Sequence, residues 1–238
     1  MNTAINVYGQ PIGFSLPNWN APGPPAPVTL TGRYCLLEPI DPERHARDLY
    51  DANALNPDGR MWTYLHYGPF ETFSDYIDWM KATCLGDDPL FFAIVDPQTN
   101  RATGVAGYLR IQPAVGVIEV GHLAYSPRLQ RSRAATEAMY LLMKHAFSLG
   151  YRRYEWKCDS LNEPSRRAAL RLGFTYEGIF RQAIVVKGRN RDTAWYSIID
   201  SEWPALDAAF QAWLDSGNFD DSGEQCRSLG DCIAAARQ

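Results

Sequence analysis

The sequence lacks the residues and spacings that mark several common classes of protein. Its five cysteines are an odd number without a C-x-x-C pair, which argues against a zinc site and against a disulfide framework. The four histidines are equally scattered. Neither a G-x-x-x-x-G-K-[ST] phosphate loop nor a G-x-G-x-x-G dinucleotide motif occurs. The sequence therefore predicts no bound metal, no ATP loop and no Rossmann site.

The sequence also has little that would direct it to a membrane or to nucleic acid. Its first residues show neither a basic segment nor an apolar core of the kind found in signal peptides. The longest apolar run, LFFAIV at Leu90–Val95, is too short to span a bilayer. The formal net charge is −4, so a general attraction to polyanions is not expected. We expect a cytoplasmic protein whose partners include neither membrane nor nucleic acid.

What the sequence does contain is enough apolar residue, 46%, to build a core. Six of the 16 prolines fall at or before Pro27, which predicts an irregular extension over residues 1–27. Residues 28–214 read as one α/β domain. The remaining 24 residues, 215–238, contain little apolar sequence, and we expect a weakly ordered C-terminal tail.

The order of expected elements indicates a mixed sheet. A strand at 34–40 precedes a helix capped by Asp41 and a second helix that begins at Thr72 or Ser74. Three β-rich runs at 89–96, 102–113 and 115–127 read as an antiparallel meander. An amphipathic helix around 135–146, a strand at 151–159 and a helix capped by Asn162 follow. A hairpin turning at 187–190 and a helix at 203–214 complete the domain.

Three arginines, Arg128, Arg131 and Arg133, stand where the third strand of the meander leads into the 135–146 helix. The first N–H groups of a helix have no internal partner and carry a partial positive charge. Strand, loop and helix N-terminus therefore favour an anion, and guanidinium groups suit phosphates. The junction is consistent with a phosphate-bearing cofactor or with a solvated basic loop.

Three segments resemble one known family. Q-R-S-R-A-A-T-E-A at 130–138 is similar to the acyl-CoA loop of the GCN5-related N-acetyltransferases, the GNAT family. I-E-V-G-H at 118–122 resembles the strand before that loop, and N-E-P-S-R-R-A-A-L-R-L-G-F at 162–174 resembles a later helix of the family. The likeness covers roughly residues 30–205 and is strongest to the branch that acetylates N-terminal amines of ribosomal proteins.

The resemblance implies a GNAT-like fold, with a mixed, mostly antiparallel central sheet flanked by helices, and acetyl-CoA as cosubstrate without a metal. It places pantetheine against free backbone groups where the sheet splays, and the diphosphate on the N–H groups of the loop. The cofactor-binding residues it implies are Leu123, Tyr125, Arg128, Arg131, Ser132, Arg133, Ala134, Ala135, Thr136 and Asn162.

The sequence departs from the family pattern at three positions. Arg133 and Ala135 stand where the loop usually has glycines, which tolerate a positive φ better than other residues. The Arg133 side chain must therefore point away from the diphosphate or clamp it. Ala169 stands where many members have a tyrosine that protonates the leaving thiolate.

Three residues are candidates for the chemistry. Glu119 is the first choice for the general base because apolar neighbours on its strand should raise a carboxylate pKa. The alternative is a carboxylate paired with an arginine of the next strand. His122 is the second choice; on a regular strand it points away from the Glu119 face unless a bulge intervenes. Ser165 is the candidate thiolate acid, or simply a first-turn serine.

The predicted activity is transfer of an acetyl group from acetyl-CoA to a primary amine by direct attack. The acceptor is a peptide N-terminus or a small molecule, and the segment TYLHYGPF at 63–70 borders its cleft or packs on the core. A non-catalytic acyl-CoA sensor and an unrelated α/β domain with a basic surface loop are the alternatives. A homodimer formed through sheet edges or the termini stays open.

Overall fold

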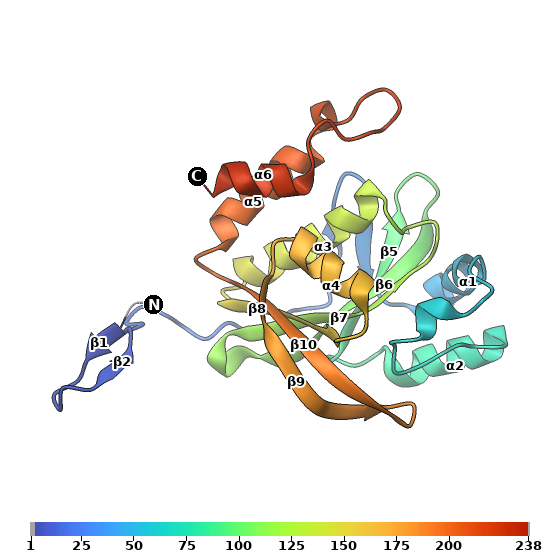
Figure 1. Ribbon diagram of the computed structural model, residues 1–238. Coiled ribbons are helices and arrows are strands. Elements are labelled where there is room, and N and C mark those ends of the chain that lie inside the picture. Colours follow the sequence, from blue (N-terminus) through green and yellow to red (C-terminus); the bar gives the residue numbers. More distant parts are fainter. Residues whose placement is uncertain (1–2, 238) are drawn as a thin grey trace.

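The computed structural model describes residues 3–237 and contains a long sheet with helices on both faces (Figure 1). The α-helices are α1 (Pro42–Asn53), α2 (Phe73–Thr83), α3 (Arg133–Ser148), α4 (Glu163–Arg171), α5 (Trp203–Leu214) and α6 (Leu229–Ala236). Short 3₁₀ turns form η1 (Arg60–Trp62), η2 (Pro113–Val115) and η3 (Ser216–Asn218). The predicted order of elements between residues 34 and 214 is confirmed.

The main sheet has eight strands in the order β3-β4-β5-β6-β7-β8-β10-β9. They are β3 (Leu30–Thr31), β4 (Leu36–Pro39), β5 (Leu90–Asp96), β6 (Arg101–Gln112), β7 (Val117–Tyr125), β8 (Arg153–Asp159), β9 (Thr175–Val186) and β10 (Arg189–Ile199). Only the β7–β8 pair is parallel among these neighbours. The predicted mixed, mostly antiparallel sheet flanked by helices is therefore confirmed.

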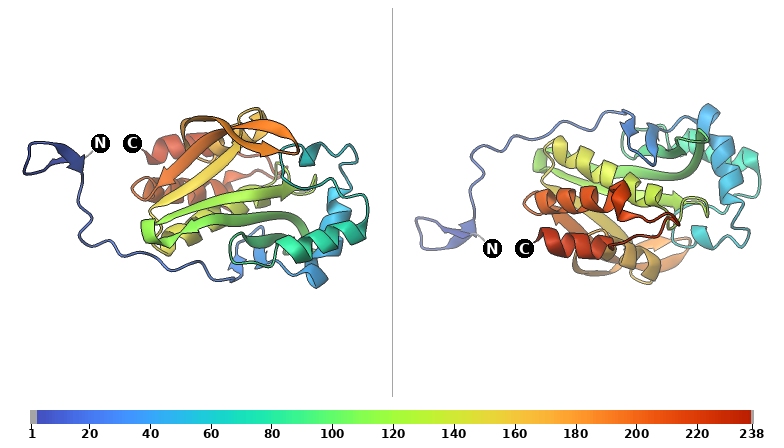
Figure 2. Two further views of the ribbon diagram at one scale, coloured as in Figure 1. Left: turned by 90° about the horizontal axis from the view of Figure 1, so that it is seen from below. Right: turned by 90° about the horizontal axis from the view of Figure 1, so that it is seen from above.

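Two separate apolar cores cover the two faces of this sheet. One joins the strands to α3, α4, α5 and α6 through residues such as Leu142 and Phe210. The other joins them to α1, α2 and η1 through residues such as Leu49 and Trp62. Figure 2 shows the C-terminal helices in front of the sheet from above, and α2 in front of it from below. The faces are called the α3 face and the α2 face below.

The parallel pair β7–β8 separates part of the way along its length. Pairing runs from Val117 opposite Arg153 to Val120 opposite Trp156, although β7 continues to Tyr125 and β8 continues to Asp159. Beyond Val120, β7 pairs with β6 alone. Backbone groups on its β8 side therefore lack a strand partner, and a gap opens in the middle of the sheet.

Helix starts follow the capping residues that the sequence indicates. The Asp41 side chain accepts from Glu43 N, and Asn162 caps α4 by accepting from Ser165 N. Thr72 begins α2 with a capping box that includes Asp75. These local bonds satisfy N–H groups that the helix itself leaves free.

The C-terminal segment is more ordered than the sequence suggested. Ser228 and Asp231 form a capping box, and α6 buries Leu229, Cys232 and Ile233. The expected weak order of this segment is therefore wrong. The segment as a whole contains few apolar residues, but those of α6 are buried together. Three apolar side chains on one face of a short helix are enough to dock it on a neighbour, and α6 lies along α5 (Figure 1).

The N-terminal segment forms a two-stranded hairpin, β1 (Thr3–Ile5) and β2 (Pro11–Gly13), that stands away from the body (Figures 1 and 2). An extended chain then leads back to the domain, where the Tyr151 hydroxyl donates to Gly23 O over 3.1 Å. Within residues 3–237 there is no helix with the length and apolar character needed to cross a bilayer.

Candidate active site

A cavity of about 1850 Å³ occupies the gap between β7 and β8. Its walls on the α3 face come from the start of α3, from α4 and from the segment between Trp213 and Gln225. On the α2 face its walls come from the segment between Asn56 and His66, from Arg110 on β6 and from Arg191 on β10. The cavity therefore connects the two faces of the sheet through the splayed strands.

A β-bulge on β7 brings both candidate bases to this cavity. Gly121 pairs with Gly107 and Ala124 pairs with Val105, so His122 and Leu123 together oppose the single residue Ala106. His122 adopts a φ of 53°, and the extra residue breaks the alternation of side chains. Glu119 and His122 consequently lie on the same face of the sheet, which a regular strand would not allow, and both line the cavity.

Glu119 is 2% exposed and is held by cations from both neighbouring strands. Arg110 Nη1 on β6 lies 2.6 Å from its Oε1, and Lys157 Nζ on β8 lies 2.8 Å from its Oε2. Burial raises the pKa of the Glu119 carboxyl, while Lys157 and Arg110 oppose that rise. The pairing with a neighbouring arginine, considered above as an alternative to catalysis, is present, and it leaves Glu119 on the cavity wall.

The ion pair at Glu119 continues along the sheet as a balanced chain of charges. Lys157 Nζ also lies 2.7 Å from Glu155, and Arg153 Nε lies 2.6 Å from the same carboxylate. Arg153 in turn pairs with Glu177 on β9. Three cations and three carboxylates therefore alternate from β6 to β9, which offsets the cost of burying each charge.

A second bulge directs Arg110 toward Glu119. The β6–β7 register shifts between Leu109 and Gln112, and Arg110 adopts a φ of 48°. The Asp88 carboxylate accepts from the N–H groups of Arg110 and Ile111 over 2.9 and 3.0 Å. Asp88 therefore holds the backbone conformation that points the guanidinium at the cavity.

His122 lies among aromatic rings. Its ring stacks on Tyr67 with centroids 5.8 Å apart and lies 4.7 Å from the Phe91 centroid. Burial lowers the His122 pKa from 6.5 to about 4, and the charges of His66 and Arg110 act in the same direction. The imidazole is therefore neutral at pH 7 and a weak base, and its ring also contributes to packing.

The arginine-rich junction forms the N-terminus of α3. Ser132 is the N-cap, and its hydroxyl accepts from Ala135 N over 3.0 Å. The residue with positive φ is Arg131, at 59°. Arg133 and Ala135 lie inside α3, where φ is negative, so the missing glycines cause no backbone strain at these two positions.

The Arg133 side chain leaves the loop and packs on aromatic rings. Its guanidinium carbon lies 4.3 Å from the ring centroid of Phe219 and 5.3 Å from that of Tyr34. Arg171 of α4 occupies the neighbouring wall, where Nη2 donates to the Thr136 hydroxyl over 3.1 Å. The segment after α5 thus covers the α3 end of the cavity.

The start of α4 supplies the remaining candidates. Ser165 Oγ accepts from Trp156 Nε1 over 3.0 Å, and its N–H donates to the Asn162 side chain. Both residues line the cavity. Ala169 is fully buried in the core, whereas its neighbour Ala168 lies on the cavity wall.

All but two of the residues expected from the sequence line this one cavity. The exceptions are Ala134 and Arg128, whose side chain is exposed outside it. Further residues that line the cavity were not named from the sequence, among them His66, Arg110, Lys157, Arg171 and Arg191. His66 and Arg171 lie within segments already singled out, at 63–70 and 162–174, whereas the other three lie on strands outside the motifs. A basic residue at a strand end is the only sequence signal that several of them share.

The segment TYLHYGPF at 63–70 both borders the cavity and packs on the core, the two roles considered for it from the sequence. Tyr64 and His66 line the cavity, and the Tyr64 hydroxyl donates to Leu161 O across the gap over 3.1 Å. Tyr67 and Phe70 instead pack on Trp79 in the core of the α2 face. The segment therefore fixes one wall of the cavity to the body of the domain.

Comparison with known proteins places this fold in one family. The model of the acetyltransferase (GNAT) domain matches residues 35–175, more than half of the chain. The chain belongs to the GNAT family of acetyltransferases, and it is therefore an acetyltransferase of the kind that takes its acetyl group from acetyl-CoA.

Individual relatives support this assignment over most of the chain. A GCN5-related N-acetyltransferase from Brucella melitensis is 46% identical, with a TM-score of 0.90 over 92% of this chain and 100% of its own. A probable GNAT acetyltransferase from Chromobacterium violaceum is 42% identical, with a TM-score of 0.77 over 82% and 98%. The uncharacterized N-acetyltransferase p20 from Bacillus licheniformis is 28% identical over 66% of this chain and 91% of its own.

Proposed function

We propose that this protein acetylates a primary amine, with acetyl-CoA entering from the α3 face and the amine from the α2 face. The observation that carries the proposal is the cavity through the splayed β7–β8 pair, with Glu119 and His122 on its wall. A passage that joins two faces lets two substrates meet at one point without sharing an entrance.

The residues on the α3 face fit acetyl-CoA. The first turn of α3 offers N–H groups of which Ser132 occupies only that of Ala135, and Arg171 adds a cation beside them. The β7–β8 pairing ends at Val120, so Leu123 and Tyr125 have no partner on β8, and Tyr125 O accepts instead from Gln130 Nε2 over 2.7 Å. When bound, acetyl-CoA supplies an activated thioester carbonyl.

Glu119 is the proposed base that removes the proton from the amine, directly or through water. A carboxylate with a raised pKa is a better base than an ordinary one, and Arg110 and Lys157 hold it in place. His122, with its pKa near 4, is proposed to shape the wall rather than to take the proton.

Ser165 is the proposed acid for the departing sulfur. Its oxygen already accepts the Trp156 indole N–H, and a hydroxyl that accepts can still donate its own hydrogen. This assignment gives the role to Ser165 because Ala169 has no acidic group and is buried in the core.

The strength of the base bears on the acceptor. Deprotonating a lysine-type amine with pKa of about 10.4 at pH 7 costs about 4.6 kcal/mol, whereas an α-amine with pKa of about 7.8 costs about 1.1 kcal/mol. A single carboxylate that is already paired with cations is better suited to deprotonating the α-amine. The resemblance to the branch that acts on ribosomal-protein N-termini supports the same class, peptide α-amines or small amines of low pKa.

The test is thiol release from acetyl-CoA with a panel of α-amines and lysine side-chain amines. We expect turnover of α-amines, and we expect Glu119→Gln to lower kcat by about 100-fold with little change in the KM for acetyl-CoA. The matched variant Glu177→Gln alters the far end of the same charge chain and should retain most of the activity. Binding of CoA without turnover of any amine would favour a sensor and contradict the proposal.

A further inference from the structure

Arg191 lies on the cavity wall and forms no ion pair, although Asp159 lies on the same wall. It belongs to β10, just beyond the point where the last residue of β8, Asp159, pairs with Thr193. Its Nη1 is 3.4 Å from His66 Nε2, which places the guanidinium on the α2 side of the cavity. None of the ion pairs among residues 3–237 includes this arginine.

The guanidinium is also incompletely hydrogen-bonded. Arg191 Nε is buried and has no hydrogen-bond partner within the described part of the chain. Buried donors are normally satisfied, and burying a charge without a partner is costly. Burial accordingly lowers the Arg191 pKa, although the nearby Asp159 opposes the change. Such an exception on a cavity wall indicates a group that a ligand completes.

The other cations on this side already have partners. Arg110 and Lys157 are matched by Glu119 and Glu155, and Arg60 pairs with Asp58. His66 supplies no counter-charge, because an imidazole is either neutral or cationic, and burial and the neighbouring cations lower its pKa and favour the neutral form. The positive charge of Arg191 therefore remains uncompensated by an ion pair at the end of the cavity that faces the amine.

We propose that Arg191, with His66 beside it, binds a carboxylate or phosphate group of the acceptor, so that the preferred substrates are amines that carry an oxyanion. This proposal rests on the proposed function, because it assigns the α2 side of the cavity to the amine. A guanidinium presents two parallel N–H groups that match the geometry of both oxyanions. The role is binding and orientation, not proton transfer.

The test compares pairs of amines that differ in charge, at equal concentrations of free amine. One pair sets dipeptide amides that begin with glutamate against those that begin with glutamine. A second sets alanine against alaninamide, and a third sets O-phosphoethanolamine against ethanolamine. We expect kcat/KM to be at least tenfold higher for the anionic member of one pair. Which pair shows this difference tells whether the site prefers a carboxylate or a phosphate.

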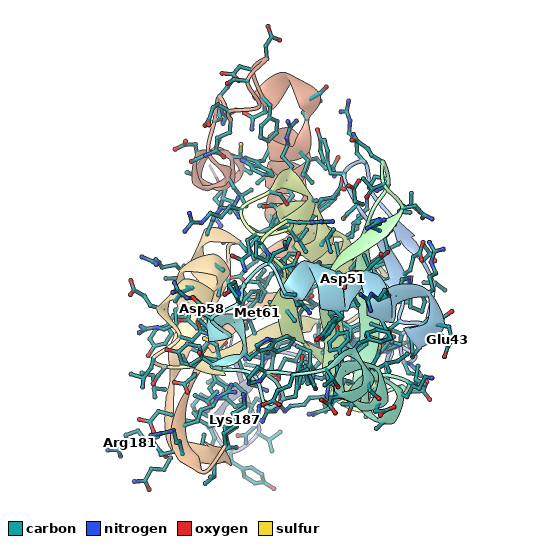
Figure 3. The ribbon with its side chains drawn as sticks, turned by 90° about the vertical axis from the view of Figure 1, so that its right-hand side faces the viewer. Glu43, Asp51, Asp58, Met61, Arg181 and Lys187 are labelled. Carbon is teal, nitrogen blue, oxygen red and sulfur yellow. The ribbon has the colours of Figure 1, made fainter. Side chains whose placement is uncertain are left out.

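Arg191→Gln should remove this preference and raise the acceptor KM at least tenfold, with the KM for acetyl-CoA unchanged. Arg191→Lys, which keeps the charge and loses the two-pronged geometry, should recover part of the preference. The matched control is Arg181→Gln on the same hairpin, whose exposed side chain points outward, away from the segment that carries Met61 (Figure 3). That control should behave as wild type.

The outcomes separate this proposal from the proposed function. If neutral and anionic amines react equally, or if the preference survives in Arg191→Gln, the oxyanion site is wrong and acetyl transfer stands. If CoA binds and no amine reacts, the proposed function fails. Calorimetry with CoA present then tests Arg191 separately, since N-acetylglutamate should bind and N-acetylglutamine amide should not. Equal affinity of the two overturns the inference.

Discussion

The half-buried, neutral state of His122 should make the stability of this protein depend on pH below 6.5. The ordinary histidine pKa of 6.5 falls to about 4 in the folded chain. Between these values the unfolded chain binds a proton at this residue and the folded chain does not. The contribution of His122 to the free energy of unfolding is therefore fully present above pH 6.5. It is lost progressively as the pH falls toward 4.

The size of the effect follows from the two pKa values. Proton binding to the unfolded state should lower the free energy of unfolding by about 2 kcal/mol between pH 8 and pH 5. This is an upper figure, because the ring is only partly buried and solvent screens part of the interaction. Asparagine is the substitution of choice, since it tolerates the positive φ at this position and does not titrate.

The assay is urea unfolding of wild type and His122→Asn at pH 8 and at pH 5. At pH 8, the difference in free energy of unfolding between wild type and His122→Asn measures the loss of ring contacts with Tyr67 and Phe91. We expect the difference to shrink by up to about 2 kcal/mol at pH 5, because the variant lacks the titrating group. Equal differences at both pH values would refute a depressed pKa at His122. Because Glu119 is the proposed base, the variant should also keep measurable activity.

Three further substitutions each test the hydrogen bonds or charge of one side chain. Glu137 accepts from the N–H groups of Arg33, Tyr34 and Cys35 over 2.8, 2.6 and 2.9 Å. Glu137→Gln should therefore cost about 3 kcal/mol in urea unfolding, and a change below about 0.5 kcal/mol would contradict the role given to this carboxylate. Lys187 donates from the β9–β10 turn to Trp62 O, Tyr67 O and Gly68 O, so Lys187→Met should speed proteolysis at residues 63–69 and raise only the acceptor KM. Arg171→Met should raise the KM for acetyl-CoA several-fold and weaken its salt dependence; an unchanged KM would exclude a phosphate contact.

The sequence could predict the half of the site that is local in the chain. The strand, loop and helix at 117–148 follow one another, so apolar periodicity and the arginines are enough to predict a helix N-terminus that favours an anion, with a solvated basic loop as the alternative. Helix caps such as Asp41 and Asn162 are also local, because each bonds to an N–H two or three residues away.

The two bulges could not be predicted in this way. His122 and Arg110 both take a positive φ, and neither is a glycine or an asparagine that would signal one. The conformation is instead imposed by partners distant in sequence, namely Asp88 at Arg110 and the register with Ala106 at His122. Each bulge changes which side chains meet: alternation along β7 puts Glu119 and His122 on opposite faces unless a bulge intervenes, and the structure contains that bulge.

The division of the site has a consequence for specificity. The proposed acetyl-CoA side combines the start of α3 with α4 and the segment between Trp213 and Gln225. The proposed amine side is assembled from the segment between Asn56 and His66, β6 and β10, which are far apart in sequence. On the proposal above, a change at His66 or Arg191 should alter acceptor preference without disturbing the α3 N-terminus, since the described hydrogen bond of these residues joins them to each other and not to that helix. Membership of the family accordingly determines the acetyl donor, while the acceptor has to be inferred from the charges of the α2 side.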